Sequence, residues 1–233
     1  MRLRKKPWVS EALLEYSDIV LVKDLLCAKT LEAGANIEDE MKKMSDRMKG
    51  CWHEIFGRTA PLHVELGTGK GKFISEMAER HPEINFVGIE SQQDVLFYVA
   101  KKVREKNLTN VRLLVFDVNH LLEIFNPQEI DRLYINFCDP WPKVRHAKRR
   151  LTHAEFLEKY RIVLAAGGEI FFKTDNRILF DFSLEQITES GLQMDKVTFD
   201  LHNSDFTGNI MTEYETKFSG LGTKINRCEI KFP

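Results

Sequence analysis

Cysteine is scarce in this sequence of 233 residues, and the few cysteines are scattered. Cys27, Cys51, Cys138 and Cys228 form no C-x-x-C pair, so their spacing argues against a zinc site of the usual kind and against a disulfide framework. Long apolar runs are also missing, and none approaches the length that crosses a bilayer. The basic N-terminus has no apolar segment of the signal-peptide kind behind it. We therefore expect a cytoplasmic globular protein that binds neither a metal nor a membrane.

Net charge is almost absent as well. The chain has 34 basic and 35 acidic residues, a net charge of −1 and an isoelectric point near 6.7. A domain that binds nucleic acid usually has an isoelectric point above about 9, so binding here would depend on local clusters. Arg2, Arg4, Lys5 and Lys6 form one cluster, and an acid-free segment holds Lys143, Arg145, His146, Lys148, Arg149 and Arg150. Charge runs are commonly solvated faces, so the clusters alone do not decide whether the protein has a site for a polyanion.

Short apolar runs alternate with amphipathic stretches from about Glu65 to Asp175, which is typical of parallel strand–helix units. We expect strands at residues 62–66, 85–90, 111–117, 133–137 and 170–172, and helices at 72–80, 94–106, 152–164 and 177–190. Thr152 and Glu155 predict a capping box for the third of these helices, which Gly167 and Gly168 would end. Residues 194–201 and 225–232 read as two further strands, an antiparallel hairpin with a long connection.

The region before the first strand is less regular. Residues 37–56 predict a charged amphipathic helix with a methionine-rich stripe, which is better explained by packing than by a cofactor role. Residues 19–36 have weak periodicity and receive no assignment. We expect residues 1–56 to be a basic, helical extension packed on the core, and residues 57–233 to form an α/β domain.

A glycine-rich turn follows the first strand and opens a helix. Gly67, Gly69 and Gly71 allow a tight turn and a close approach of a nucleotide, although such strings also occur by chance. Glu90 ends the next strand, where a carboxylate can accept hydrogen bonds from the two hydroxyls of a ribose. Glu65 precedes the turn; it would repel a pyrophosphate but suits the ammonium of a methionine moiety. The string E-x-G-x-G-x-G resembles the first motif of Rossmann-like methyltransferases, so it favours S-adenosylmethionine over NAD. Asp117, at the end of the third strand, would then reach the adenine amino group.

A proline-rich loop follows the fourth strand, at the edge where open α/β sheets bind ligands. Proline after Asp139 and after Trp141 predicts extended geometry for both residues and a stiff loop. Such a loop would present a carboxylate and an indole in fixed positions, although Asp-Pro is also a common turn. The acid-free basic segment follows directly, so a methyl-transfer loop at this place implies a polyanionic substrate.

The segments D-P-W-P-K-x-R-H-x-K-R-R-L, F-K-T-D-N, L-H-N-S and N-I-M-T-E-Y-E-x-K-F resemble those of the bacterial tRNA (guanine-N7-)-methyltransferase family. With the glycine motif, the resemblance covers residues 1–8 and 61–233. It implies a class I methyltransferase fold with a mostly parallel seven-stranded sheet, helices on both faces and an antiparallel C-terminal strand. It also implies tRNA as partner and guanosine 46 of the variable loop as the methylated base.

The resemblance further implies the roles of individual residues. The cofactor site would comprise Glu65, Gly67, Gly69, Glu90, Asp117 and Asp139, and Asp139 would also be the catalytic residue. Substrate contacts would come from Lys143, Asp175, Thr212, Glu213, Tyr214 and Glu215, and RNA contacts from Arg145, His146, Lys148, Arg149 and Arg150.

The chemistry agrees with these residue types. Guanine N7 carries an exposed lone pair, so its methylation requires no proton removal and no activated nucleophile. The product ring is positively charged, and a nearby carboxylate stabilises that charge. Asp139, Asp175 and Glu215 are candidates to accept hydrogen bonds from the N1–H and N2 donors of guanine, and we expect Asp139 nearest the reacting base. An NAD-dependent oxidoreductase and a non-catalytic RNA-binding module remain as alternatives, and the chain is either a monomer or a homodimer.

Overall fold

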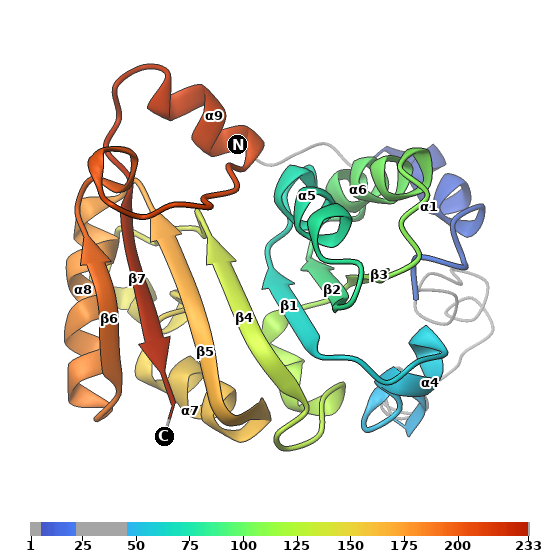
Figure 1. Cartoon of the computed structure of the whole chain (residues 1–233), viewed down its shortest axis with the longest axis horizontal. Coiled ribbons are helices and arrows are strands. Elements are labelled where there is room, and N and C mark those ends of the chain that lie inside the picture. Colours follow the sequence, from blue (N-terminus) through green and yellow to red (C-terminus); the bar gives the residue numbers. More distant parts are fainter. Residues whose placement is uncertain (1–5, 22–45, 233) are drawn as a thin grey trace.

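The computed structural model describes residues 6–21 and 46–232 and contains one seven-stranded sheet (Figure 1). The strand order is β3-β2-β1-β4-β5-β7-β6. The strands are β1 (Leu62–Leu66), β2 (Asn85–Glu90), β3 (Val111–Val115), β4 (Ile130–Asn136), β5 (Leu164–Thr174), β6 (Gln193–Thr198) and β7 (Asn226–Lys231). Neighbouring strands from β3 to β5 pair in parallel, whereas β7 pairs antiparallel with both β5 and β6. The expected fold class, including the antiparallel C-terminal strand, is confirmed.

Helices cover both faces of the sheet because the strands alternate between two apolar clusters. The helices α5 (Lys72–Arg80) and α6 (Gln93–Glu105) lie over one face, and α7 (Ala154–Val163) and α8 (Arg177–Glu189) over the other (Figure 1). In β2, Phe86 belongs to the apolar cluster that contains residues of α5 and α6, whereas the next residue, Val87, belongs to the cluster that contains residues of α7 and α8. No helix in the described part of the chain has the length and apolar character needed to cross a membrane.

The N-terminal helix α1 (Pro7–Leu14) packs against α6. The Trp8 ring meets the Phe97 ring edge to face, with centroids 5.2 Å apart, and the Ser10 hydroxyl bonds the Gln93 side chain. The expected helix at 37–56 begins outside the described residues, and within them residues 46–48 and 52–56 are helical but do not form one continuous helix. The chain breaks at Gly50, whose φ is +83°, and restarts as α4 (Trp52–Phe56). The boundary expected after residue 56 stays a prediction.

Two details around α7 differ from the expectation. Thr152 does not cap the helix: its side chain is fully buried and its hydroxyl bonds that of Ser183 at 2.7 Å. His153 is the N-cap instead, and its ring accepts from the Glu155 N–H. Gly167 does not end the helix either, because β5 already begins at Leu164 and continues past it. Both errors arise because tertiary contacts override local helix signals.

The fold brings three connections to one place. Strand order reverses between β1 and β4, and the crevice at such a reversal is where open α/β sheets bind ligands. The glycine turn follows β1 and the proline-rich loop follows β4 at this edge. The short helix α9 (Glu213–Ser219), in the connection from β6 to β7, lies above the same edge (Figure 1).

Candidate active site

A cleft of about 970 Å³ opens at the carboxyl ends of β1, β2 and β4. It gathers most of the residues that the sequence analysis singled out. The lining includes Glu65, Gly67, Gly69, Glu90, Asp117, Asp139, Arg149, Thr212, Glu213 and Tyr214. Residues separated by almost 150 positions in the sequence therefore border one space.

The glycine turn has the geometry that only glycine adopts easily. Gly67, Gly69 and Gly71 have φ values of +81°, +52° and +80°. A Cβ on Gly71 would lie 2.5 Å from the Val99 side chain, so this position also allows α5 to pack on α6. At Gly67 and Gly69 nothing described lies within 4 Å of a Cβ, and both residues line the cleft. The turn therefore leaves free space for a ligand beside its backbone.

Glu65 is a buried acid with an unused acceptor. The side chain is 2% exposed, and its Oε1 accepts from Asn136 Nδ2 at 2.9 Å. Its Oε2 has no hydrogen-bond partner among the described residues. Burial raises the pKa of Glu65 to about 8, and the Asn136 hydrogen bond only partly opposes this. A buried acceptor without a partner is costly, so the site fits a ligand that brings a donor, such as the ammonium of S-adenosylmethionine.

Two further acids border the cleft at the neighbouring strand ends. Glu90 accepts from the N–H groups of Gly69 and Gln92, and burial raises its pKa. Asp117 is exposed and accepts from the Asn119 N–H at 2.9 Å. Each carboxylate oxygen has a second lone pair, so both residues can still accept from a ribose hydroxyl or an adenine amino group. The acids and the glycine turn together fit S-adenosylmethionine.

The loop after β4 is held in an unusual conformation. Phe137 and Trp141 have φ values of +54° and +42°, so Trp141 is left-handed rather than extended, contrary to the proline rule. Arg150 explains how the loop keeps this shape. Its Nε donates to the Pro140 carbonyl and its Nη2 to the Trp141 carbonyl, both at 3.1 Å. Non-glycine residues at positive φ persist only where the surroundings determine them, as this guanidinium does.

This contact corrects the role expected of Arg150. The side chain is 6% exposed and also lies over the Phe182 ring at 4.3 Å. A buried guanidinium that bonds two carbonyls has no access to an RNA phosphate. We therefore assign Arg150 to the loop and not to the RNA surface.

Asp139 lies on this loop and differs from the other acids of the cleft. It is exposed, lines the cleft and makes no hydrogen bond with the described residues. Its carboxylate is therefore available to a ligand in the cleft.

The segment 212–215 forms the opposite wall. Thr212 caps α9 by accepting from the Glu215 N–H at 2.9 Å. Glu213 accepts from the Lys72 N–H at the start of α5 and forms an ion pair with Lys102 of α6. Tyr214 donates its hydroxyl to Asp175 at 2.9 Å. These contacts fasten the segment to α5, to α6 and to the end of β5.

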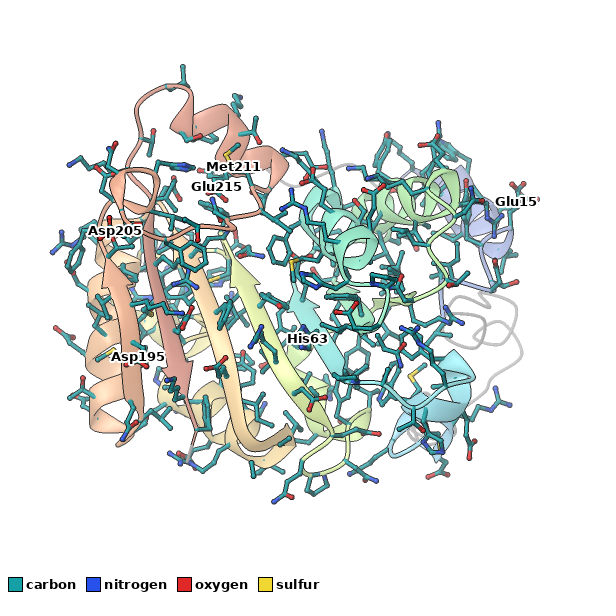
Figure 2. All side chains as sticks on the ribbon, in the orientation of Figure 1. Glu15, His63, Asp195, Asp205, Met211 and Glu215 are labelled. Atoms are coloured by element: carbon teal, nitrogen blue, oxygen red, sulfur yellow. The ribbon has the colours of Figure 1, made fainter. Side chains whose placement is uncertain are left out.

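Glu215 does not line the cleft, so the expected contact between Glu215 and guanine is corrected. The residue is fully buried, and it accepts hydrogen bonds from Lys173 at 2.8 Å and Asn209 at 2.7 Å. Figure 2 places Glu215 between α9 and the ends of the strands. A carboxylate with these partners is not available to a base.

The acid-free basic segment follows the loop that carries Asp139 in the chain, and its residue Arg149 lines the cleft. Lys143, Arg145, Lys148 and Arg149 are exposed, and the helical turn Val144–Arg149 buries none of its residues. The Arg149 guanidinium lies over the Trp141 ring at 5.0 Å, and the His146 ring meets that indole edge to face. Lys148 forms an ion pair with Glu155. Arg149 and His146 therefore join this basic segment to Trp141 of the loop that carries Asp139.

Asn136, which bonds Glu65, belongs to no motif of the sequence that marks it as a site residue. Its position was informative, because it is the last residue of β4 and thus lies beside the end of β1. Within residues 6–21 and 46–232, no group of three His, Cys, Asp or Glu side chains could hold a metal ion.

Comparisons with known proteins identify the family of this chain. Residues 59–228 match the family described as "Putative methyltransferase". The chain is 47% identical over 232 residues to the tRNA (guanine-N(7)-)-methyltransferase of Halalkalibacterium halodurans, an alignment covering 100% of this chain and 96% of the relative. It is 46% identical to the protein of that name in Bacillus subtilis, with coverage of 100% and 99%.

Solved structures place the fold in the same class. A structure described as an antibiotic-related methyltransferase superposes with a TM-score of 0.58 and 20% identity, over 77% of this chain and 91% of that one. That identity bears on the fold alone, whereas the full-length sequence matches define the family. The chain belongs to the family of the tRNA (guanine-N(7)-)-methyltransferases.

Proposed function

We propose that this protein methylates N7 of guanosine 46 in the variable loop of tRNA, with S-adenosylmethionine as the methyl donor, and that it acts in the cytoplasm. One observation carries the proposal. A single cleft combines the unpartnered, buried Oε2 of Glu65 with the free carboxylate of Asp139. The first suits a cationic amino-acid moiety, and the second suits a base that becomes positively charged. The names of the full-length relatives supply the class of substrate.

The cofactor would lie between the glycine turn and the acids at the strand ends. Glu65 would accept from the ammonium, Glu90 from the ribose hydroxyls and Asp117 from the adenine amino group. Gly67 and Gly69 leave room for its backbone contacts. When bound, S-adenosylmethionine supplies an electrophilic methyl group.

The residues facing the base have an electrostatic task. Guanine N7 presents its lone pair in the major groove, so no residue has to remove a proton from it. Methylation leaves positive charge on the ring, and a carboxylate fixed beforehand stabilises that charge without reorganising. Asp139 would serve in this role, because it is on a loop whose carbonyls Arg150 holds.

Guanine differs from adenine by its N1–H and N2 donors. Asp139 is the candidate that lines the cleft. Asp175 lies outside that lining and accepts from the Tyr214 hydroxyl, and Glu215 is committed to Lys173. A site built to pair with these donors rejects the base that lacks them, because its acceptors would stay unpaired. Lys143, Arg145 and Arg149 would hold the phosphates beside the loop.

The proposal is tested by incubating the protein with methyl-labelled S-adenosylmethionine and unmodified tRNA. We expect label in 7-methylguanosine at position 46, and no label in a tRNA whose guanosine 46 is replaced by adenosine. Calorimetry with S-adenosylmethionine and with NADH should give binding of the first alone. Label at another base, or NADH binding without a response to S-adenosylmethionine, would contradict the proposal.

A further inference from the structure

Lys173 is a buried cation near the carboxyl end of β5. Its side chain is 5% exposed, and its ammonium donates three hydrogen bonds. The acceptors are Glu215 Oε2 at 2.8 Å, Asn209 Oδ1 at 3.0 Å and the Ile210 carbonyl at 2.9 Å. An ammonium has three protons, so this set uses all of them. Asn209 and Ile210 belong to the connection that leads into α9, and Glu215 lies in the first turn of α9.

Glu215 closes the network from the other side. It is fully buried, and its Oε1 accepts from Asn209 Nδ2 at 2.7 Å and lies 3.2 Å from His202 Nε2. Its N–H donates to the Thr212 hydroxyl at 2.9 Å. The two ends of the segment 209–215 are thus tied to each other and to β5 through Lys173.

Between these ties lie the residues that border the cleft. Glu213 and Tyr214 line it, and the Tyr214 ring is 5.1 Å from that of Phe137, two residues before Asp139. A shift of the Lys173–Glu215 pair would therefore move the wall that faces the Asp139 loop. A buried ion pair is often no more stabilising than well-packed apolar residues, so stability alone is a weak reason for this one.

We infer that Lys173 is a positioning residue of methyl transfer: through Glu215 and Asn209 it fixes the wall of the cleft against which the guanine is held. The inference rests on the proposed function. Lys173 itself does not line the cleft. It acts through the segment 209–215, whose placement decides how well a bound base is aligned with the methyl donor.

The decisive variant is the double substitution Lys173→Met with Glu215→Leu, compared with each single substitution. Each single variant leaves a buried charge without its main ionic partner and should lower Tm, whereas the apolar pair should restore it. We expect the double variant to keep the parent's Kd for S-adenosylmethionine. Its kcat at saturating tRNA should nevertheless be roughly 10- to 100-fold lower, because a base that is bound but misaligned reacts slowly.

The matched control is Arg132→Met with Glu169→Leu, which removes an ion pair between β4 and β5 farther from the cleft. It should retain the parent's kcat. A second test, independent of whether the double variant folds, is Asn209→Ala, which keeps the ion pair and removes its bridge. Asn209→Ala should lower kcat with a smaller change in Tm.

Parent-like kcat in Asn209→Ala, or in a double variant with restored Tm, would overturn the inference. So would a loss of cofactor affinity that accounts for the whole loss of activity. Failure of the proposed function would be a different result, because the parent protein itself would then not methylate an unmodified tRNA.

Discussion

Arg150 holds Trp141 in place by a hydrogen bond of 3.1 Å from its guanidinium Nη2 to the Trp141 carbonyl oxygen. Trp141 lies just before the basic segment 143–150, and Arg150 is the last residue of that segment. The C-terminal end of the segment therefore fixes the loop that precedes its N-terminal end. Trp141 has a positive φ, and the Arg150 guanidinium is almost fully buried. The basic segment and the loop that carries Asp139 are thereby held together.

Replacing Arg150 should act on the loop and not on RNA affinity. Arg150→Ala leaves two carbonyls without their donor, which should destabilise the protein by about 1–3 kcal/mol. We expect kcat to fall roughly 10- to 100-fold, because Asp139 loses its fixed position. Arg150→Lys should rescue little, since an ammonium does not reproduce the two-pronged guanidinium. Denaturant unfolding and steady-state kinetics provide the two measurements.

The salt dependence of tRNA binding separates this role from a phosphate contact. The slope of log affinity against log salt should stay at the parent value in Arg150→Ala. If the slope in Arg150→Ala were flattened as much as in a variant of an exposed arginine, Arg150 would instead be a phosphate contact.

Arg145 and Arg149 should contact phosphate. Both are exposed and Arg149 lines the cleft, and a near-neutral protein has few other places to concentrate positive charge. Replacing either by alanine should weaken tRNA binding and flatten the salt slope, by up to about 0.9 for duplex-like sites and about 0.7 for single strands. Filter binding at several salt concentrations measures both. Lys101→Ala, on α6 and outside the cleft lining, is the matched control and should keep the parent slope. Unchanged slopes in both arginine variants would remove this segment from the RNA site.

Cofactor binding should release a proton from Glu65. The pKa of its carboxyl is raised to about 8, so the free protein holds this acid mostly protonated at pH 7. An ammonium beside it favours the ionised form, so affinity should rise with pH up to about 8, by at most about tenfold per pH unit. Calorimetry in buffers of different ionisation enthalpy measures the released proton.

The same shift has a consequence for stability. Because the folded pKa of Glu65 exceeds the ordinary value of 4.5, the stability it contributes is full at low pH and is lost as pH rises through about 8. Glu65→Gln should abolish both this decline and the proton release. An affinity for S-adenosylmethionine that is independent of pH in the parent would mean that the ammonium is held elsewhere.

The sequence predicts the bounds of a strand or helix correctly where one local pattern determines them. Leu62–Leu66, Asn85–Glu90 and Lys72–Arg80 have the bounds that apolar runs and helical periodicity predict. The acids of the cleft were found because parallel strands bring their carboxyl ends to one edge. A sequence pattern does not reveal which polar group is buried. In the sequence, Arg150 cannot be told from its exposed neighbour Arg149, nor Glu215 from Glu213. The fold distinguishes them, because it places two carbonyls beside Arg150 and Lys173 beside Glu215.

The break at Gly50 has the same origin. Residues 46–56 keep a helical spacing of apolar residues, but Trp52 stacks on Phe125 with ring centroids 5.1 Å apart, and its indole donates to the Ile124 carbonyl. Contacts of this kind, made 72 residues away in the chain, decide where the helix ends.

Asp139 should matter for the chemical step more than for binding. Asp139→Ala should leave Tm and the Kd for S-adenosylmethionine close to the parent values, because the carboxylate is exposed and bonds no described residue. Its loss removes the charge that stabilises the methylated guanine, so kcat should fall by about 10²–10³. Asp139→Asn keeps the shape and a hydrogen-bond acceptor but not the charge. It should therefore be nearly as slow as alanine if electrostatics dominates, and nearly as fast as the parent if base recognition dominates. Single-turnover rates at saturating tRNA decide between these, and a parent-like rate with only a raised KM would transfer the charge-stabilising role to Asp175.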